Sequence, residues 1–462
     1  RQMRRVVLRD EAPAGVPWDV ALLPEPTLDA RSVFDRAVHS SMRAASAFFG
    51  KTDFDGQINW MTTGLLDVTG ERPWSMMTGN VAYLAIGAPI AGHGSWMVRG
   101  AWSAGEPSSW VMLGEFTSSG DERHAIRAGV SYGALRPRGT DRVSQGLSVG
   151  EARTAGAVYL LDRWTVRPGL DVSYGLRVDA YDYLARSPVL SPRLGARVAV
   201  IGRTAVTLDG LQHAVAPGTA EFQPPAAAGL WLPPDRSFAS IRSGGAIRAE
   251  RVRELAVGVE HAFGAAGAER TVAFRRFRQT SHDQLVTLFG PGTAGASHYL
   301  TGALGDVEVT GWSARLTGAL SPHVRGDITY AAGRVGWESA TRMSRRIQAL
   351  APSMVRGPRE TLHDLSASVH AEIPATSTHV AMAYRVSSGF SATGAAGPVA
   401  RARFAVEVRQ PLPYQPLRGG SFDVLVGVRN LYRDLDDPGS FYDELLTVSP
   451  PLRFVGGIQV RF

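Results

Sequence analysis

Residues 170–179 read LDVSYGLRVD, and this stretch decides the fold class. Apolar side chains occupy every even position from Leu170 to Val178, while Asp, Ser, Gly and Arg occupy the odd positions through Asp179. A period of two places successive side chains on opposite faces of a β-strand. The stretch therefore predicts a strand with one apolar face and one charged face, the latter carrying Arg177.

The same alternation recurs from about residue 56 to the C-terminus. Examples are residues 96–102, 126–132, 194–200, 255–263, 324–330, 365–373, 402–408, 422–428 and 452–462. A soluble β-sandwich and a membrane β-barrel both contain such strands; polar faces meet water in the first, apolar faces meet lipid in the second. Full charges on the polar faces and strand lengths of about nine to twelve residues favour the barrel.

Connections between the strands alternate between short and long, as in outer-membrane barrels. Short turns are predicted near residues 202–203, 264–267, 321–322, 375–377 and 413–420. Long loops are predicted at residues 215–249, 290–298, 338–359, 391–398 and 433–449. We therefore predict an all-β fold, a transmembrane antiparallel up-and-down β-barrel over residues 56–462. About 18 strands are expected, within a range of 16–22.

Residues 1–55 follow a different pattern. Residues 1–27 are Pro-rich and irregular, which is typical of a linker. Residues 28–49 have a helical period, with Val33, Phe34 and Phe48 on one broad apolar face. We expect this short helix at the periplasmic mouth or inside the lumen, a small helix without a packing partner being the alternative. The sequence shows no signal peptide, and we expect the chain to begin within a longer precursor.

Composition and missing motifs exclude several classes of function. The chain has no cysteine, which excludes thiolate metal sites and Cys nucleophiles. Its net charge of +7 comes from scattered arginines, so we expect no nucleic-acid partner. The histidines lack metal-site spacing, and no GxSxG or phosphate-binding loop occurs. We predict a protein that is not an enzyme and has no cofactor or metal, although a hydrolase site assembled from distant strands stays open.

Tryptophan and tyrosine residues occur where the interfacial aromatic girdles of a membrane barrel are expected. Ordinary strand aromatics are the alternative. The candidates are Trp60, Trp74, Trp96, Trp102, Trp110, Tyr159, Trp164, Tyr174, Tyr181, Trp312 and Trp337.

Four stretches carry a family resemblance. They are SPRLG at residues 191–195, ERVRELAVGVEHAF at 250–263, RNLY at 429–432 and LRFVGGIQVRF at 452–462. From about residue 165 onward the chain resembles the C-terminal barrel of TonB-dependent receptors, and residues 56–165 resemble it through their pattern. The resemblance implies a bacterial outer-membrane location. It departs from the family because no plug domain or TonB box is recognised, and because 22 strands are usual.

The C-terminal strand is the most specific part of this resemblance. It ends in an aromatic residue that follows apolar residues at alternate positions, which resembles the signal read by the barrel-assembly machinery. An exposed strand edge of this kind can pair with a template strand during insertion. The signal residues are Phe454, Ile458, Val460 and Phe462.

Two classes of function remain. The resemblance implies an outer-membrane receptor or porin-like channel for uptake of a ligand; the alternative is a structural barrel that anchors a partner complex. Expected partners are the lipid bilayer with its lipopolysaccharide, the assembly machinery, and a periplasmic or outer-membrane protein. The candidates for lumen electrostatics are Arg177, Asp179, Arg401, Arg403, Glu407, Arg409, Arg453 and Arg461. The candidate outer-loop charges, for which solvated loop charges are the alternative, are Arg342, Arg345, Arg346, Asp436 and Asp437.

Overall fold

A computed structural model describes most of the strands and part of the loops. The described residues are 55–66, 79–104, 108–118, 123–136, 152–218, 237–241, 248–265, 269–289, 298–339, 357–393, 402–413, 421–431, 441–442, 445–448 and 452–461. Within these ranges no helix is long and apolar enough to cross a membrane. The predicted linker and helix of residues 1–54 lie outside the described residues and stay predictions.

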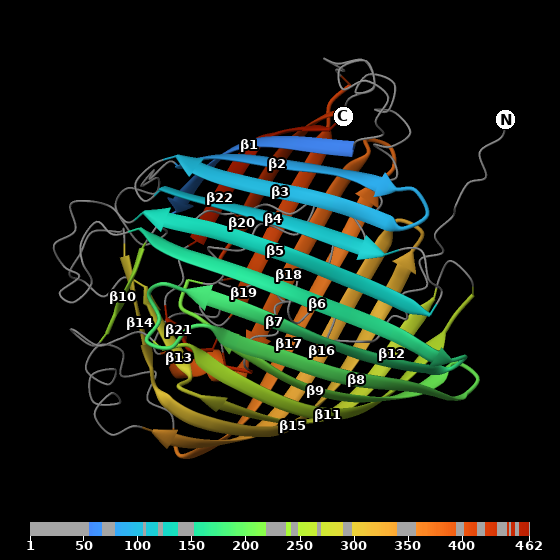
Figure 1. Ribbon diagram of the computed structural model, residues 1–462, viewed down its shortest axis with the longest axis vertical. Helices are drawn as coiled ribbons and strands as arrows, with labels where there is room; N and C mark the ends of the chain where they lie inside the picture. The colour runs from blue at the N-terminus through green and yellow to red at the C-terminus, as the bar shows by residue number, and fades with distance from the viewer. Residues whose placement is uncertain are drawn as a thin grey trace.

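The described residues form a closed antiparallel barrel of 18 strands (Figure 1). Each barrel strand pairs with the next one along the chain, and β1 pairs with β22 to close the ring. The predicted fold class is therefore confirmed. The barrel strands are β1 (Asp55–Leu66), β2 (Gly79–Ile90), β3 (Gly94–Ala104), β4 (Ser108–Ser118), β5 (His124–Arg136), β6 (Arg153–Arg167), β7 (Leu170–Tyr181), β8 (Val189–Ile201), β9 (Thr204–Val215), β11 (Glu250–Phe263), β12 (Arg270–His282), β15 (Gly305–Ser321), β16 (Val324–Ser339), β17 (Arg359–Ile373), β18 (Thr378–Ser387), β19 (Ala402–Pro411), β20 (Ser421–Arg429) and β22 (Leu452–Arg461).

The longest connections lie at one end of the barrel, and most of the tight turns lie at the other. Gly169 and Gly202 adopt positive φ angles in two of the tight turns, a backbone conformation that favours glycine. We call this end the turn end and the opposite end the loop end. Gln57 of β1 lies in register with Arg461 of β22, so the first and last described strands meet at the turn end.

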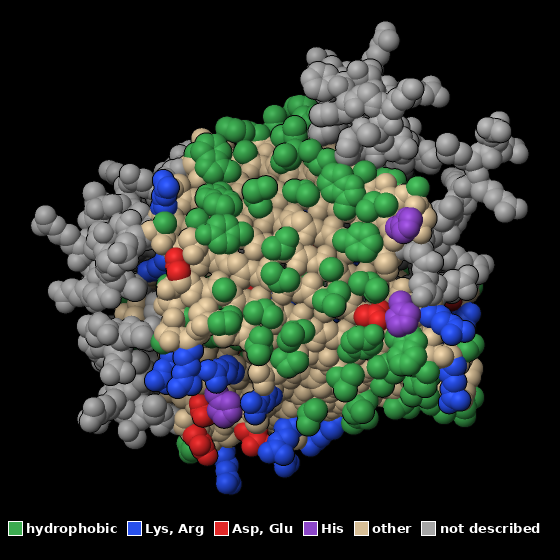
Figure 2. Space-filling view, in the orientation of Figure 1, with side chains coloured by type: hydrophobic (Ala, Val, Ile, Leu, Met, Phe, Trp, Pro, Cys, Tyr) green, Lys and Arg blue, Asp and Glu red, His purple; other side chains and the backbone are tan. Residues whose placement is uncertain are grey.

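The outer face of the barrel is apolar, because alternate residues of each strand point away from the lumen. Leu255, Leu194 and Val158 are among the large apolar side chains that remain more than half exposed. Figure 2 shows such side chains spread over most of the visible wall. Exposed apolar surface of this extent suits lipid rather than water. The predicted division into an apolar and a charged face is confirmed on β7, where Tyr174 is exposed while Arg177 and Asp179 are buried.

Some of the predicted girdle residues lie on the outer face of the barrel, and others do not. Trp60, Trp102, Trp110, Trp164 and Tyr174 are exposed on the outer face, as predicted. Three of the predicted girdle residues are instead buried on the inner face, and for them the prediction is wrong: Tyr159, Tyr181 and Trp337. The apolar inner surface described below accounts for Tyr181 and Trp337, and Tyr159 donates a hydrogen bond of 2.6 Å to Glu115. Trp74 lies outside the described residues.

Five further elements belong to the loops rather than to the barrel. Four short strands gather at the loop end, on the left of Figure 1, and a 3₁₀ helix follows β18. They are β10 (Ser237–Ser240), β13 (Leu285–Phe289), β14 (His298–Ala303), β21 (Thr447–Val448) and η3 (Ser388–Thr393).

Candidate functional site

Three connections at the loop end fold together into a small sheet, which we call the loop sheet. β10 comes from the β9–β11 connection, β13 and β14 from the β12–β15 connection, and β21 from the β20–β22 connection. Their order is β10, β14, β13, β21. The Thr287 amide donates to the Leu446 carbonyl at 3.0 Å, and the Ile241 amide donates to Thr301 at 2.9 Å. Backbone hydrogen bonds thus join loops that are far apart in the sequence.

One side of the loop sheet packs against the wall formed by β11, β12 and β15–β17. Val286 and Leu288 of β13 are almost fully buried there. The wall contributes inward-facing Phe277, Val309 and Trp337. Burying a side chain of this size stabilises a fold by about 1.5–3 kcal/mol. The cluster also includes Tyr442, Leu445 and Leu446 from the β20–β22 connection.

The other side of the loop sheet packs against the wall formed by β5–β8. Phe238, Phe289 and Tyr299 form an aromatic group with ring centroids 5.1–5.8 Å apart. Inward-facing residues such as Leu135 and Tyr181 complete this cluster. The loop sheet therefore packs inside the loop end of the lumen against two sectors of the wall that only β9 separates. This matters because an 18-stranded barrel is wide enough to leave an aqueous channel.

Glu250, the first residue of β11, anchors the base of the loop sheet. Its carboxylate is fully buried and accepts hydrogen bonds from Ser281 Oγ at 2.7 Å and Gln284 Nε2 at 2.8 Å. It also accepts from the backbone amide of Leu285, the first residue of β13, at 3.0 Å. A buried carboxylate is stable when several donors surround it in this way. Glu250 thus fixes where the β12–β15 connection turns into the lumen.

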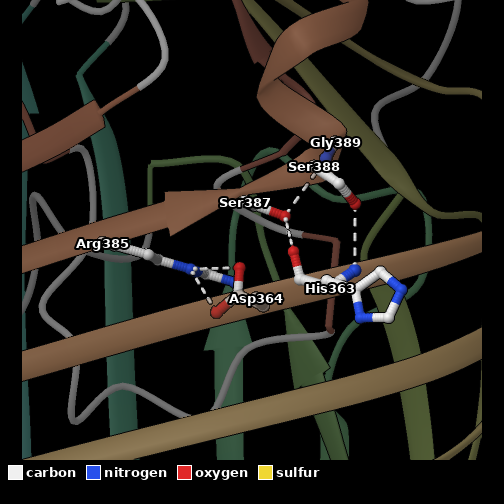
Figure 3. A network of polar contacts seen from close by, with 6 residues as sticks. All are labelled: His363, Asp364, Arg385, Ser387, Ser388 and Gly389. Atoms are coloured by element: carbon white, nitrogen blue, oxygen red, sulfur yellow. Dashed lines mark hydrogen bonds and ion pairs between the residues drawn. The ribbon is translucent and has the colours of Figure 1, made fainter.

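A serine network anchors η3 to the barrel rim (Figure 3). Ser388 Oγ accepts from the His363 amide at 2.9 Å, and Ser387 Oγ donates to the His363 carbonyl at 3.1 Å. The Gly389 amide donates to Ser387 Oγ at 3.2 Å. Beside them, Arg385 Nε donates to both carboxylate oxygens of Asp364 at 3.0 and 3.1 Å. These bonds fix the loop that carries Phe390.

Arg403 of β19 connects η3 to the loop sheet. Its guanidinium carbon lies 5.0 Å from the centre of the buried Phe390 ring. Its Nη2 donates to the carbonyl of Thr447 in β21 at 3.2 Å. Arg153 of β6 makes a similar contact on another part of the wall, 4.0 Å from the centre of the Phe238 ring. Cation–π contacts of desolvated arginines stabilise by about 2 kcal/mol.

Two further polar residues of the wall hold the β20–β22 connection. Gln279 Oε1 accepts from the backbone amide of Phe441 at 2.7 Å. Glu360 Oε1 accepts from Tyr442 Oη at 2.7 Å and from Trp337 Nε1 at 3.1 Å. All three loop connections of the sheet are therefore fastened to inward-facing side chains.

The lumen wall nearer the turn end is charged, and many of its charges are paired. Arg99 lies 3.6 Å from Glu115, and Arg275 lies 2.6 Å from Glu254. The other pairs of this kind are Arg197 with Glu260, Arg315 with Asp327, and Arg461 with Asp423. Paired charges of this kind satisfy a buried polar surface without leaving one sign in excess.

The structure brings several predicted lumen residues to the inner face. Arg177 and Asp179 form a buried ion pair at 2.8 Å. Arg403 and Arg409 are buried on the inner face of β19, and Glu407 shares that face. Arg461 is buried beside Asp423, and Arg453 lies on the same face of β22. Their effect on pore electrostatics stays a prediction, and Arg403 has a structural contact with the loops that the sequence did not predict.

The other predicted residues are separate from this site or lie outside the described residues. Phe454, Ile458 and Val460 lie on the outer face of β22, the strand that closes the barrel; their part in assembly stays a prediction. The predicted residues outside the described ranges are Arg342, Arg345, Arg346, Arg401, Asp436, Asp437 and Phe462.

The sequence reasoning missed the loop sheet and its polar anchors. Residues 284–289, QLVTLF, and 299–304, YLTGAL, are apolar runs inside or beside predicted loops. Apolar runs in a loop indicate a buried segment, and this signal was available. Glu250 was recognised as part of a family stretch but not as an anchor, because its partners are distant in the sequence: Ser281 lies on β12 and Gln284 in the connection after it.

Comparison with known proteins places the barrel in a family. The family model described as "TonB dependent receptor-like, beta-barrel" matches residues 18–430. A search of the curated proteins finds no match.

Solved structures that the comparison finds include two receptors and one iron transporter, all with low sequence identity. The siderophore receptor PirA from Pseudomonas aeruginosa is 11% identical, with a TM-score of 0.37 over 88% of this chain and 80% of that one. A mutant of the ferric enterobactin receptor PfeA from the same organism is 12% identical, with a TM-score of 0.40 over 83% of this chain and 62% of that one. The FrpB iron transporter of Neisseria meningitidis is 12% identical, with a TM-score of 0.41 over 88% of this chain and 70% of that one.

The chain thus spans less than two thirds of the length of PfeA. The family assignment rests on the model match, which covers most of the chain and nearly all of the barrel strands. A closed antiparallel barrel with long loops at one end agrees with it, and its 18 strands are fewer than the 22 that the resemblance implied. The chain belongs to the TonB-dependent receptor-like β-barrel family, whose members are outer-membrane transport proteins.

Proposed function

We propose that the protein is an outer-membrane receptor that takes up a ligand, with a mouth closed by its own loops. The observation that carries the proposal is the loop sheet, which packs inside the loop end of the lumen against two neighbouring sectors of the wall, β5–β8 and β11–β17. A general porin needs an open lumen, whereas a receptor that releases its cargo inward needs a barrier that yields under control. The family membership supports uptake over general diffusion.

The anchors of the loop sheet support a barrier that opens as a unit. Glu250 binds the β12–β15 connection, whereas Glu360 and Arg403 both bind the β20–β22 connection. The two connections are joined by the pairing of β13 with β21, so release of one weakens the packing of the other. A ligand that binds the outer loops in the open state would shift the population toward opening. On this proposal the loop end faces the exterior and the turn end faces the periplasm, where a TonB-type partner would act.

Conductance in a planar bilayer tests the proposal. We expect the intact chain to be closed and Leu288→Asp, which places a charge in the loop-sheet core, to conduct. A steady open pore from the intact chain would contradict the receptor proposal. A variant that lacks residues 1–55 is measured in parallel. If this variant conducts while the intact chain does not, residues 1–55 contribute to closure.

Uptake in the native host separates the receptor from the structural alternative. We expect deletion of the gene to reduce depletion of one solute from the growth medium, and the intact gene to restore it. If no solute is affected while a partner complex is lost from the outer membrane, the protein is a scaffold instead.

A further inference from the structure

The inner wall between the loop sheet and the turn end differs from one sector of the barrel to another. On β1, β2 and β20, inward-facing side chains such as Met61, Val81 and Leu425 are apolar and almost fully buried. On β15–β18 the inward positions at this level carry hydroxyl groups and paired charges. Ser366 and Ser368 of β17 are only partly buried there. A solute inside the lumen therefore meets polar groups on the β15–β18 sector.

Strand register sets four of these polar side chains in one row, which we call the polar row. Arg315 of β15 is in register with Thr329 of β16. Ser366 of β17 is in register with Thr329 on one side and with Arg385 of β18 on the other. The Cα atoms of the two arginines are therefore about 14 Å apart, which is three interstrand spacings. The row lies nearer the turn end than Val309 of β15, which belongs to the loop-sheet core.

Both arginines of the polar row form their ion pairs through Nε. Arg385 Nε donates to both carboxylate oxygens of Asp364 (Figure 3), and Arg315 Nε donates to Asp327. Asp327 also accepts from Thr329 Oγ1 at 3.3 Å. Within the part of the chain that the structure describes, the Nη groups of the two arginines have no hydrogen-bond partner. These groups are strong donors that a bound solute can use.

The serines beside the arginines add groups that both donate and accept. Neither Ser366 nor Ser368 forms a side-chain hydrogen bond with another of the described residues. A hydroxyl group carries one donor and two acceptor lone pairs. The row has no net charge, because Asp327 and Asp364 balance the two arginines. Such a surface suits a neutral solute that both donates and accepts, whereas an ion would meet charges of both signs.

We propose that the polar row binds a neutral, hydroxyl-rich solute of the sugar class, as the first site that this solute meets after it passes the loop sheet. The order of these events rests on the proposed uptake function, and the binding itself does not. Solute oxygens accept from the Nη groups of Arg315 and Arg385, and solute hydroxyls donate to Ser366. A solute of two linked sugar rings is long enough to contact both arginines.

Saturation-transfer NMR of the full chain tests the site, in micelles of a detergent that has no sugar headgroup. The probes are maltose, which is a neutral disaccharide, and citrate, which is an anion. We expect transfer to maltose and little transfer to citrate. Arg315→Lys/Arg385→Lys keeps both positive charges but removes the Nη groups, so affinity for maltose should fall about tenfold. The matched control is Arg197→Lys, because Arg197 of β8 also pairs through Nε, with Glu260.

Protection of introduced thiols gives a second readout, since the chain has no cysteine of its own. Ser366→Cys should react more slowly with a small water-soluble thiol reagent when maltose is present. Ala125→Cys lies at an exposed inward position of β5 and should react at the same rate with and without maltose. Heat-modified migration on gels confirms that each variant folds.

Three outcomes would overturn the site. Absence of transfer to maltose would show that the row binds no solute of this class. Stronger binding of citrate would show that the row recognises an anion. Equal maltose binding by the double variant and by Arg197→Lys would place the sugar elsewhere on the protein. None of these outcomes depends on the conductance of the intact chain, so failure of the site is distinguishable from failure of the proposed receptor function.

Discussion

The two ends of the lumen are lined by different kinds of side chain. At the loop end, inward-facing apolar residues such as Phe277, Trp337 and Tyr181 pack against loops that fold back into the barrel. Nearer the turn end, the same strands present arginines paired with carboxylates, such as Arg315 with Asp327. The lumen wall is thus not uniformly polar along its length, although each strand keeps its period of two.

The difference shows what covers the apolar wall at the loop end. An apolar inner wall is stable only when something apolar covers it, and the loop sheet does so with Val286, Leu288 and Phe289. Paired charges toward the turn end have no such requirement, because ions such as Arg315 and Asp327 have their partner on the wall itself. The loop end therefore depends on the loops and the turn end does not. Substitutions at the two ends should have separable effects.

The largest effect is expected from Leu288→Asp. An unpaired carboxylate in this apolar core costs several kcal/mol, which exceeds what the loop sheet gains at that position. We expect the loop sheet to leave the mouth while the barrel stays folded, seen as a new conductance with unchanged heat-modified migration. The control is Leu412→Asp at an exposed position of the turn end. A closed Leu288→Asp barrel would contradict this dependence on the loops.

A substitution at the turn end should lower the stability of the barrel by a comparable amount without opening the lumen. Arg461→Ala removes the ion pair of Asp423, whose side chain is fully buried. Breaking a buried pair costs about 3–5 kcal/mol. Urea unfolding of the barrel should therefore shift to lower concentration while conductance stays at the parent level. Arg278→Ala, at an exposed pair, should lose at most about 1 kcal/mol. If Arg461→Ala conducts, the two ends do not have separable effects, which contradicts this prediction.

Glu250→Ala should loosen the base of the loop sheet. It leaves three donors without their acceptor, at a cost of about 2–3 kcal/mol. Hydrogen exchange at residues 284–289 should rise while exchange in β7 and β8 does not change. Glu308→Ala, an exposed carboxylate on the outer face, serves as the control. Uniformly faster exchange along the barrel would mean that Glu250 supports the wall and not the loops.

A smaller effect is expected from Arg403→Ala. The substitution removes the contact with Phe390 and the hydrogen bond to Thr447, together worth about 1–2 kcal/mol. Exchange should rise at residues 388–390 and 445–448. Arg409→Ala, on the same face of β19 but nearer the turn end, should leave those segments unchanged.

The smallest effect is expected on ion selectivity. In a Leu288→Asp background that conducts, Arg409→Gln removes one cationic charge from the lumen wall. Anion preference should fall by less than about twofold, because the wall carries charges of both signs. Arg278→Gln, on the outer face, should not change it. An unchanged preference on neutralising Arg401, Arg403 and Arg409 together would exclude these arginines from pore electrostatics.

The barrel was predictable from the sequence because its signal is local. A period of two is visible in each strand by itself, and the stretch ERVRELAVGVEHAF coincides with β11 (Glu250–Phe263). The two faces were assigned correctly on β7 and β19 because charged and apolar residues separate cleanly there. Tyr159 was misplaced because residues 157–161, AVYLL, are apolar on both faces, so that phase alone does not identify the outer one.

The candidate site was not predictable because it depends on pairing between distant loops. β13 and β21 are about 160 residues apart in the sequence, and their register is set by packing inside the barrel. Arg403 was correctly placed in the lumen by its phase. Its contact with Phe390 and Thr447 follows from how two loops fold, which no strand pattern encodes.

Thiol labelling from the outside tests the central claim most directly, since the chain has no cysteine of its own. Leu288→Cys places a thiol inside the loop sheet, and Arg248→Cys places one on an exposed loop-end residue. With a bulky, membrane-impermeant maleimide on intact cells, we expect rapid labelling at position 248 and protection at position 288. Equal labelling at both positions would show that the loop sheet is not packed in the mouth of the membrane-embedded barrel.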